Sequence, residues 1–137
     1  MKPLRMLALA GLPLMLVAPA AAQELKIHVD GCPHACAHHW TADIGLQGTT
    51  ARQDQGVDGK LEAYEVYLRG GYGASAAIGR PLLRRVPAAQ VGDQVERLVA
   101  RYLEGRLPGE RFQAYVTRVP DEELQSIAAA ERQEVPA

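Results

Sequence analysis

Both cysteines of this chain, three of its four histidines and its only tryptophan lie within residues 30–40, DGCPHACAHHW. Immediately upstream, LKIHVD alternates apolar and polar residues, which predicts a half-buried β-strand. Three side chains share the apolar face of this strand, namely Leu25, Ile27 and Val29. The chain therefore has to fold so that the end of a strand presents a dense group of sulfur and imidazole side chains.

The spacing of the two cysteines predicts how they are presented. Cys32 and Cys36 are four residues apart, so one helical turn would place both sulfur atoms on one face. Pro33 suits the first turn of such a helix, because the N–H group that it lacks has no partner there. The sequence thus predicts a strand, a cysteine, one helical turn and a second cysteine.

Sulfur and imidazole ligands suit zinc, copper and iron–sulfur clusters. A tetrahedral zinc ion would draw on both cysteines and on two of the three nearby histidines, so the candidate metal ligands are Cys32, Cys36, His34, His38 and His39. The alternative is a disulfide between the two cysteines, which would need a turn that brings their β-carbons to within roughly 4.5 Å. Spacing alone leaves both possibilities open.

Residues 1–22, MKPLRMLALAGLPLMLVAPAAA, are typical of a secretory signal peptide. Lys2 and Arg5 form a basic start, an apolar run follows over 6–17, and small residues precede a cleavage site after position 22. The alternative is an uncleaved membrane anchor, but the apolar run is short for a helix that spans a membrane. We therefore expect a periplasmic or secreted protein whose mature part, residues 23–137, forms one domain. Two cysteines in an exported protein would ordinarily form a disulfide.

The charge balance excludes several classes of partner. The chain has 15 Lys and Arg against 16 Asp and Glu, and removal of the signal, with its two basic residues, makes it more acidic. This balance predicts no nucleic-acid partner and no membrane binding after signal cleavage. Aromatic residues are only 5% of the chain, too few for base-stacking platforms. The sequence also lacks the G-x-S-x-G, P-loop, dinucleotide-binding and metalloprotease motifs.

The order of the remaining patterns predicts the fold class. Strand patterns occur over 40–48, 61–71 and 82–86, with a polar surface loop over 49–60. Helical patterns follow over 88–104, over 112–119 and from Pro120 onward. The apolar stripe of the first helix consists of Val91, Val95, Leu98, Val99, Tyr102 and Leu103. Strands first and helices later predict an α+β fold, with a small mixed sheet of three to four strands packed against C-terminal helices.

Several stretches resemble one protein family. GCPHACAHHWTADIGLQG resembles the C-terminal cluster-binding segment of siroheme-dependent nitrite and sulfite reductases, which shows Gly-Cys-Pro-Asn-x-Cys and then an Ala-Asp-Ile-Gly-like strand. YEVYLRGGYGASAAIGRPLLRRVP is similar to the next strand and glycine turn of that family, and VERLVARYLEGRLPGERFQAYVTRVPDEEL to its closing helices. The similarity runs from about residue 25 to 125. Related precorrin-modifying enzymes share the pattern, so the resemblance selects no single reaction.

The resemblance implies roles for individual residues. Cys32 and Cys36 match the second cysteine pair that holds a [4Fe–4S] cluster, and Cys36 matches the thiolate that also bridges to the siroheme iron. His34 departs from the family, which usually has asparagine there beside the macrocycle. The glycine turn that lies near the cofactor region in the family corresponds to Gly70, Gly71 and Gly73. The alternative role for these glycines is a tight strand exit that needs positive φ.

The chain supplies only half of the family's cluster site. A [4Fe–4S] cluster needs four thiolates or equivalent ligands, and this chain has two cysteines. In the family the other pair, and the basic residues that hold the substrate anion, come from an earlier part of the polypeptide. We therefore expect a redox-cofactor-binding domain that needs a dimer mate or a partner redox subunit, and whether it belongs to an enzyme stays open. The alternatives are a periplasmic module with zinc, copper or haem held by the cysteines and histidines, or a cofactor-free disulfide domain.

Overall fold

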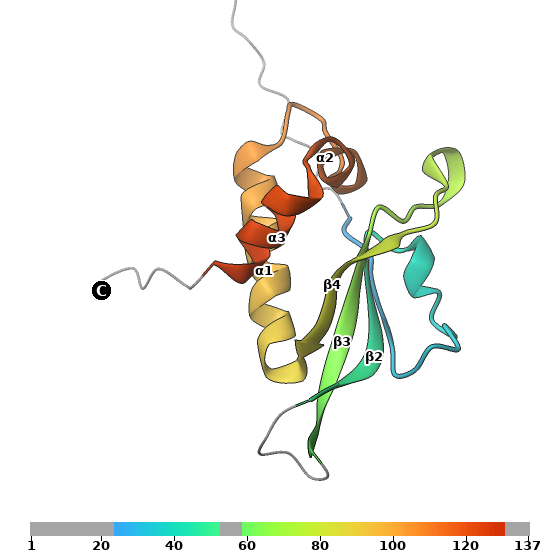
Figure 1. Ribbon diagram of the computed structural model, residues 1–137. Coiled ribbons are helices and arrows are strands. Elements are labelled where there is room, and N and C mark those ends of the chain that lie inside the picture. Colours follow the sequence, from blue (N-terminus) through green and yellow to red (C-terminus); the bar gives the residue numbers. More distant parts are fainter. Residues whose placement is uncertain (1–23, 53–58, 131–137) are drawn as a thin grey trace, which may run out of the picture.

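The computed structural model describes residues 24–52 and 59–130 (Figure 1). A four-stranded sheet has the order β1-β2-β3-β4, with β1 parallel to β2 and the other neighbours antiparallel. The strands are β1 (Ile27–Asp30), β2 (Ile44–Arg52), β3 (Lys60–Leu68) and β4 (Arg80–Pro87). The helices that follow are α1 (Ala88–Gly105), α2 (Phe112–Arg118) and α3 (Asp121–Ala129). The predicted α+β class with a small mixed sheet and C-terminal helices is confirmed.

The hydrophobic core lies between one face of the sheet and the helices, which Figure 1 shows together on one side of the strands. From the sheet, β2 and β3 contribute Ile44, Leu46, Val66 and Leu68. From the helices, the fully buried members are Leu98, Phe112, Val116, Leu124 and Ala128. The predicted stripe of α1 is right for Leu98 and Tyr102 but wrong for Leu103, which is 57% exposed. Leu103 lies one residue, or about 100° of helix rotation, beyond Tyr102 and so faces away from the core.

Strand β1 buries the face opposite to the one that its apolar residues predict. Ile27 and Val29 are 46% and 52% exposed, whereas Asp30 is buried. The parallel register aligns Ile27 and Val29 with core residues of β2. However, α1 packs mainly on β3 and β4, and α3 mainly on β4, so the helices cover the other side of the sheet more than this edge strand. The polar face is covered instead by the segment that follows β1. The alternation thus predicted the strand correctly and its buried side incorrectly.

Two predicted boundaries near the cysteine segment are also wrong. The predicted strand over 40–48 begins only at Ile44, because His39–Thr41 forms a short 3₁₀ helix, η1. At its other end β2 continues to Arg52, into the predicted loop over 49–60, because its last residues pair with β3 from Lys60 onward. The signal prediction over residues 1–22 lies outside the described residues. Across 24–52 and 59–130, no helix combines the length and the apolar character needed to cross a membrane.

Candidate functional site

The two cysteines lie on the cysteine loop, which we define as residues 31–38 between β1 and η1. This loop is a series of turns and not the helical turn that the spacing predicted. Ala35 has a left-handed φ of 56°, so the right-handed path between the two cysteines is interrupted. Both thiols are free and exposed, and Cys32 Sγ lies 3.3 Å from His34 Nδ1. The structure therefore contains no disulfide between Cys32 and Cys36.

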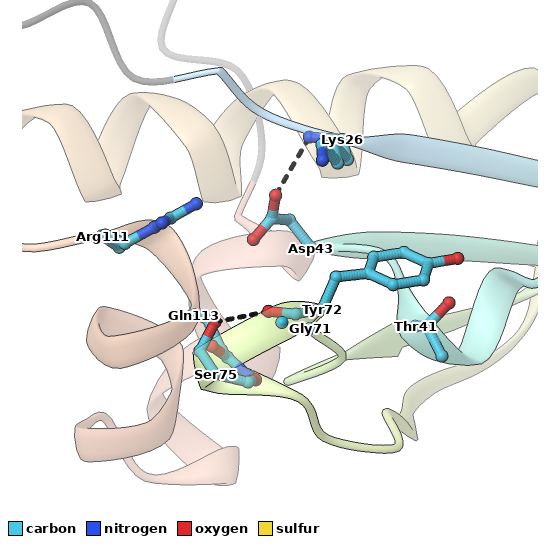
Figure 2. Close-up of a pocket in the computed structure, with 9 residues that line it drawn as sticks. Lys26, Thr41, Asp43, Gly71, Tyr72, Ser75, Arg111 and Gln113 are labelled. Atoms are coloured by element: carbon cyan, nitrogen blue, oxygen red, sulfur yellow. Dashed lines mark hydrogen bonds between the residues drawn. The ribbon is translucent and has the colours of Figure 1, made fainter.

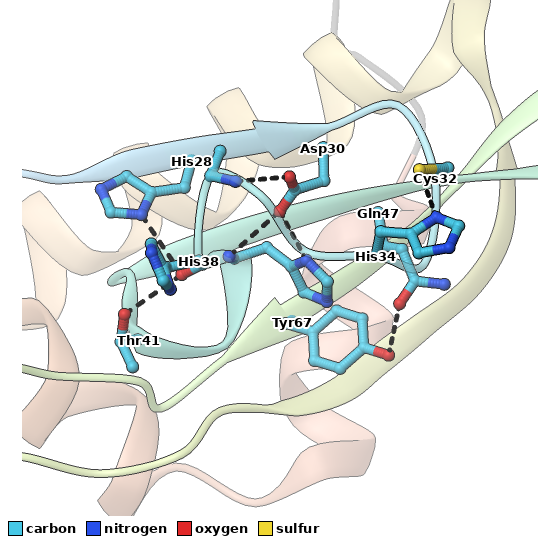
Figure 3. A network of polar contacts seen from close by, with 10 residues as sticks. His28, Asp30, Cys32, His34, His38, Thr41, Gln47 and Tyr67 are labelled. Carbon is cyan, nitrogen blue, oxygen red and sulfur yellow. Dashed lines mark hydrogen bonds and ion pairs between the residues drawn. The ribbon is translucent and has the colours of Figure 1, made fainter.

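Asp30, the last residue of β1, ties the cysteine loop to the sheet (Figure 3). Its Oδ1 accepts a hydrogen bond from the Ala37 backbone N–H at 2.7 Å. Its Oδ2 accepts one from the His39 backbone N–H at 3.2 Å and contacts His39 Nδ1 at 2.7 Å. The Ala37 hydrogen bond, together with the His39 contacts, holds the pKa of Asp30 below its usual value despite the opposing effect of burial. One buried carboxylate thus fixes the end of the cysteine loop and the start of η1 to the end of β1.

His39 is a core residue and not an exposed ligand. It has no exposed surface, and its ring centroid lies 5.0 Å from that of Trp40 and 4.7 Å from that of Tyr67. Its Nδ1 is engaged by Asp30, and its Nε2 is buried without a hydrogen-bond partner within the described part of the chain. The prediction of His39 as a metal ligand therefore finds no support, because packing accounts for the side chain.

The other histidines do not converge on the cysteines as a metal site would need. His34 and His38 are exposed, and His34 reaches Cys32, as described above. The His38 carbonyl instead lies 3.3 Å from Nδ1 of His28, on β1 (Figure 3). Among residues 24–52 and 59–130, no three His, Cys, Asp or Glu side chains form a group that could hold a metal ion. The geometry therefore gives the zinc or copper alternative no support.

The predicted glycine turn is required mainly by close packing. Of the three glycines of this turn, only Gly73 has a positive φ, of 62°. A Cβ on Gly70 would lie 2.4 Å from Ala42 O, and one on Gly71 would lie 2.3 Å from Ser75 O. Real Cβ atoms essentially never approach backbone atoms so closely. The positive-φ explanation is thus wrong for Gly70 and Gly71, and contacts within the chain account for both glycines.

Sequence reasoning missed two glycines that let the cysteine loop and η1 lie directly on β2. A Cβ on Gly45 would lie 2.1 Å from His39 O, and one on Gly48 would lie 2.3 Å from Gly31 O. The available signal was the occurrence of two glycines inside a pattern of strand residues, which often marks close approach by another backbone. Together with Asp30, these glycines position the segment that carries both thiols.

The donor set of the loop fits one edge of an iron–sulfur cluster. Thiolates are the ligands that such clusters use, and four are required. The loop offers two free thiols, Cys32 and Cys36, both accessible from outside the domain. The described residues therefore fit half of the ligand set.

Comparisons with known proteins give the family. The model of the nitrite and sulphite reductase 4Fe-4S domain matches residues 19–135. The chain is 38% identical over 101 residues to sulfite reductase [ferredoxin] 1 of Mycolicibacterium paratuberculosis, covering 73% of this chain and 18% of that protein. It is 34% identical over 98 residues to the assimilatory ferredoxin-dependent nitrite reductase of Haloferax mediterranei, covering 72% of this chain and 16% of the relative.

A solved structure agrees with these matches. The NirA protein of Mycobacterium tuberculosis superposes with a TM-score of 0.67 and 32% sequence identity, over 76% of this chain and 19% of that one. The chain thus spans less than a fifth of the length of these relatives. The resemblance of the cysteine segment, the glycine turn and the closing helices is confirmed, and the chain belongs to the nitrite and sulphite reductase 4Fe-4S domain family.

Proposed function

We propose that this domain binds one edge of a [4Fe–4S] cluster through Cys32 and Cys36, and that a second copy or a separate redox subunit supplies the remaining thiolates. The observation that supports the proposal is the presentation of two free thiols on a loop that a buried carboxylate fixes to the sheet. When bound, such a cluster stores and passes single electrons. The chain's own part is to hold two ligands in place and to leave room for the others.

The surroundings of the loop favour contact with another chain. Both cysteines are exposed, so ligands from outside the domain can reach the same cluster. Ile27 and Val29, on the strand that leads into the loop, are about half exposed and form an apolar surface beside it. Uncovered apolar surface next to an incomplete site is what a partner would bury. The family also implies siroheme, with Cys36 as the thiolate next to its iron and His34 in place of the usual asparagine.

The test is an anaerobic preparation of the chain in two forms: reconstituted with iron and sulfide, and isolated with a tag from its native cells. We expect a brown protein with iron and sulfide bound and a native mass larger than one chain; siroheme would add strong visible bands. Cys32→Ser and Cys36→Ser should each lose the iron. Ala37→Ser, which changes the same loop without removing a thiol, should keep it. Colourless, iron-free protein from both preparations, with both thiols open to alkylation, would reject the proposal.

We also infer that the domain is exported, because residues 1–22 combine a basic start, an apolar run and a small-residue cleavage site. An exported chain that crosses the membrane unfolded would acquire its cofactor after export. The measurement is the intact mass and N-terminal sequence of the protein from the extracytoplasmic fraction. We expect a chain that begins near Gln23; a chain that keeps residues 1–22 and stays in the cytoplasm contradicts the inference.

A further inference from the structure

A small polar pocket lies at the end of β1 that is remote from the cysteines (Figure 2). Lys26 precedes the strand and lines the pocket, whereas Cys32 follows the strand. The pocket has a volume of about 230 Å³. This is smaller than the usual pocket for a drug-sized molecule or a cofactor. Its size therefore suits a small ion or a single functional group.

The charges in the pocket are mixed. Lys26 and Arg111 are its cations, and Asp43 is its carboxylate. Figure 2 shows the Arg111 side chain extended toward Asp43, with Lys26 on the other side of that carboxylate. One oxygen of Asp43, Oδ2, accepts a hydrogen bond from the Lys26 backbone N–H at 3.0 Å, so the carboxylate is held in place. The Lys26 ammonium lies 5.8 Å from the centroid of the Tyr72 ring, which forms a further wall.

The rim of the pocket is fixed by contacts within the chain. Gln113 Nε2 donates a hydrogen bond to Ser75 O at 2.9 Å, which joins the start of α2 to the turn after β3. Gly71 packs between the same two residues, since a Cβ there would lie 2.3 Å from Ser75 O and 2.5 Å from Gln113 Nε2. The walls therefore come from separate elements that are already joined by these contacts. The pocket is thus formed before any ligand binds.

We propose that this pocket binds a hydrogen-phosphate group. Two cations favour a small anion, and the planar guanidinium of Arg111 suits the oxygen pairs of a phosphate. A carboxylate can only accept hydrogen bonds, so Asp43 selects an anion that carries an acidic hydrogen. Hydrogen phosphate has this hydrogen at neutral pH, whereas sulfate does not and would set its oxygen atoms against those of Asp43. The pocket thus distinguishes two tetrahedral anions of similar size by one proton.

The first test is an NMR titration of the full chain with inorganic phosphate and, separately, with sulfate. We expect phosphate to shift the amide signals of the pocket and to bind at least about tenfold more tightly than sulfate. Arg111→Gln should weaken phosphate binding about tenfold. The matched control is Arg101→Gln, which removes the same charge from an exposed arginine on α1, outside the pocket, and should leave binding unchanged. Glycerol 3-phosphate, titrated in parallel, should bind more weakly than inorganic phosphate, because a phosphomonoester has a second pKa of about 6 and has mostly lost its acidic hydrogen at neutral pH. Tighter binding of the ester would contradict selection by Asp43.

The second test reverses the selectivity. Asp43→Asn keeps an oxygen that accepts from the Lys26 backbone N–H and adds N–H donors, so this variant should bind sulfate at least as tightly as phosphate. Equal binding of both anions by the wild type, or unchanged phosphate binding in Arg111→Gln, would overturn the proposal. This site does not depend on the cluster, because the titration is carried out on the chain whether or not iron is bound.

Discussion

Replacing Gly45 by alanine should drive η1, and with it the end of the cysteine loop, away from the sheet. An added Cβ on this residue of β2 lies 2.1 Å from His39 O and 2.8 Å from His39 C. Ordinary van der Waals contact begins at 3.4 Å, so the backbone at His39 has to move by about 1.3 Å. The atoms that clash belong to the backbone, and no flexible side chain can absorb the movement.

The expected loss of stability follows from this clash. Overpacking of a well-packed site costs typically about 1–3 kcal/mol. The shift also pulls the fully buried ring of His39 out of its contacts with Trp40 and Tyr67. We therefore expect Gly45→Ala to lose about 3 kcal/mol of unfolding free energy, at the upper end of that range. For a domain of about 100 residues this corresponds to a fall in Tm of roughly 12 °C or more.

Urea unfolding measures the effect, with the fluorescence of Trp40 as a probe because this only tryptophan lies in η1 next to the loop. Gly92→Ala is the matched control, since Gly92 lies in α1 and a Cβ there meets nothing within 4 Å. Alanine has a higher helix propensity than glycine, so Gly92→Ala should raise the unfolding free energy by about 0.5–1 kcal/mol. A Gly45→Ala protein as stable as the wild type, beside a control that gains the expected stability, would refute the close-approach argument.

Three further predictions test other parts of the structure. The Ala37 hydrogen bond lowers the pKa of Asp30 in the folded state, so the ionised carboxylate stabilises the fold above about pH 4, and this stabilisation is lost as the pH falls through the folded-state pKa. Urea midpoints measured against pH should show this loss for the wild type, and Asp30→Asn should remove it. Phe112→Ala empties a fully buried site and should lower the unfolding free energy by about 3–5 kcal/mol, measured by urea unfolding; a loss below about 1 kcal/mol contradicts the assigned core. Gly73→Ala should lower the unfolding free energy by about 1 kcal/mol through backbone strain, because its added Cβ meets no other atom. Gly70→Ala, whose added Cβ meets the Ala42 carbonyl, should lower the Tm more than Gly73→Ala does, and the reverse order of the two Tm values contradicts the packing argument.

The histidines of the cysteine segment show the limit of reading ligands from composition. His34 and His39 look equivalent in the sequence, as imidazoles close to thiols. In the structure, His34 is exposed and lies beside Cys32, while His39 is fully buried against Asp30. The difference arises because the end of β1 points its carboxylate inward, and that depends on which face of the strand the rest of the chain covers.

The sequence by itself determined the local elements and the family. Strand alternation and helical spacing depend on neighbours a few residues apart, so α1, the start of α3 after Pro120 and the order of strands before helices could be predicted. The motif around Cys32 and Cys36 likewise identified the family without coordinates.

Only the tertiary structure decided which faces are buried and which residues meet. The exposed Ile27, the buried His39 and the short approach to Gly45 all depend on how far the helices extend over the sheet and on how the cysteine loop folds back. The pocket that joins Lys26 to Arg111 brings together residues from opposite ends of the domain. Local patterns carry no information on such contacts, because these are set by long-range packing that satisfies the whole chain at once.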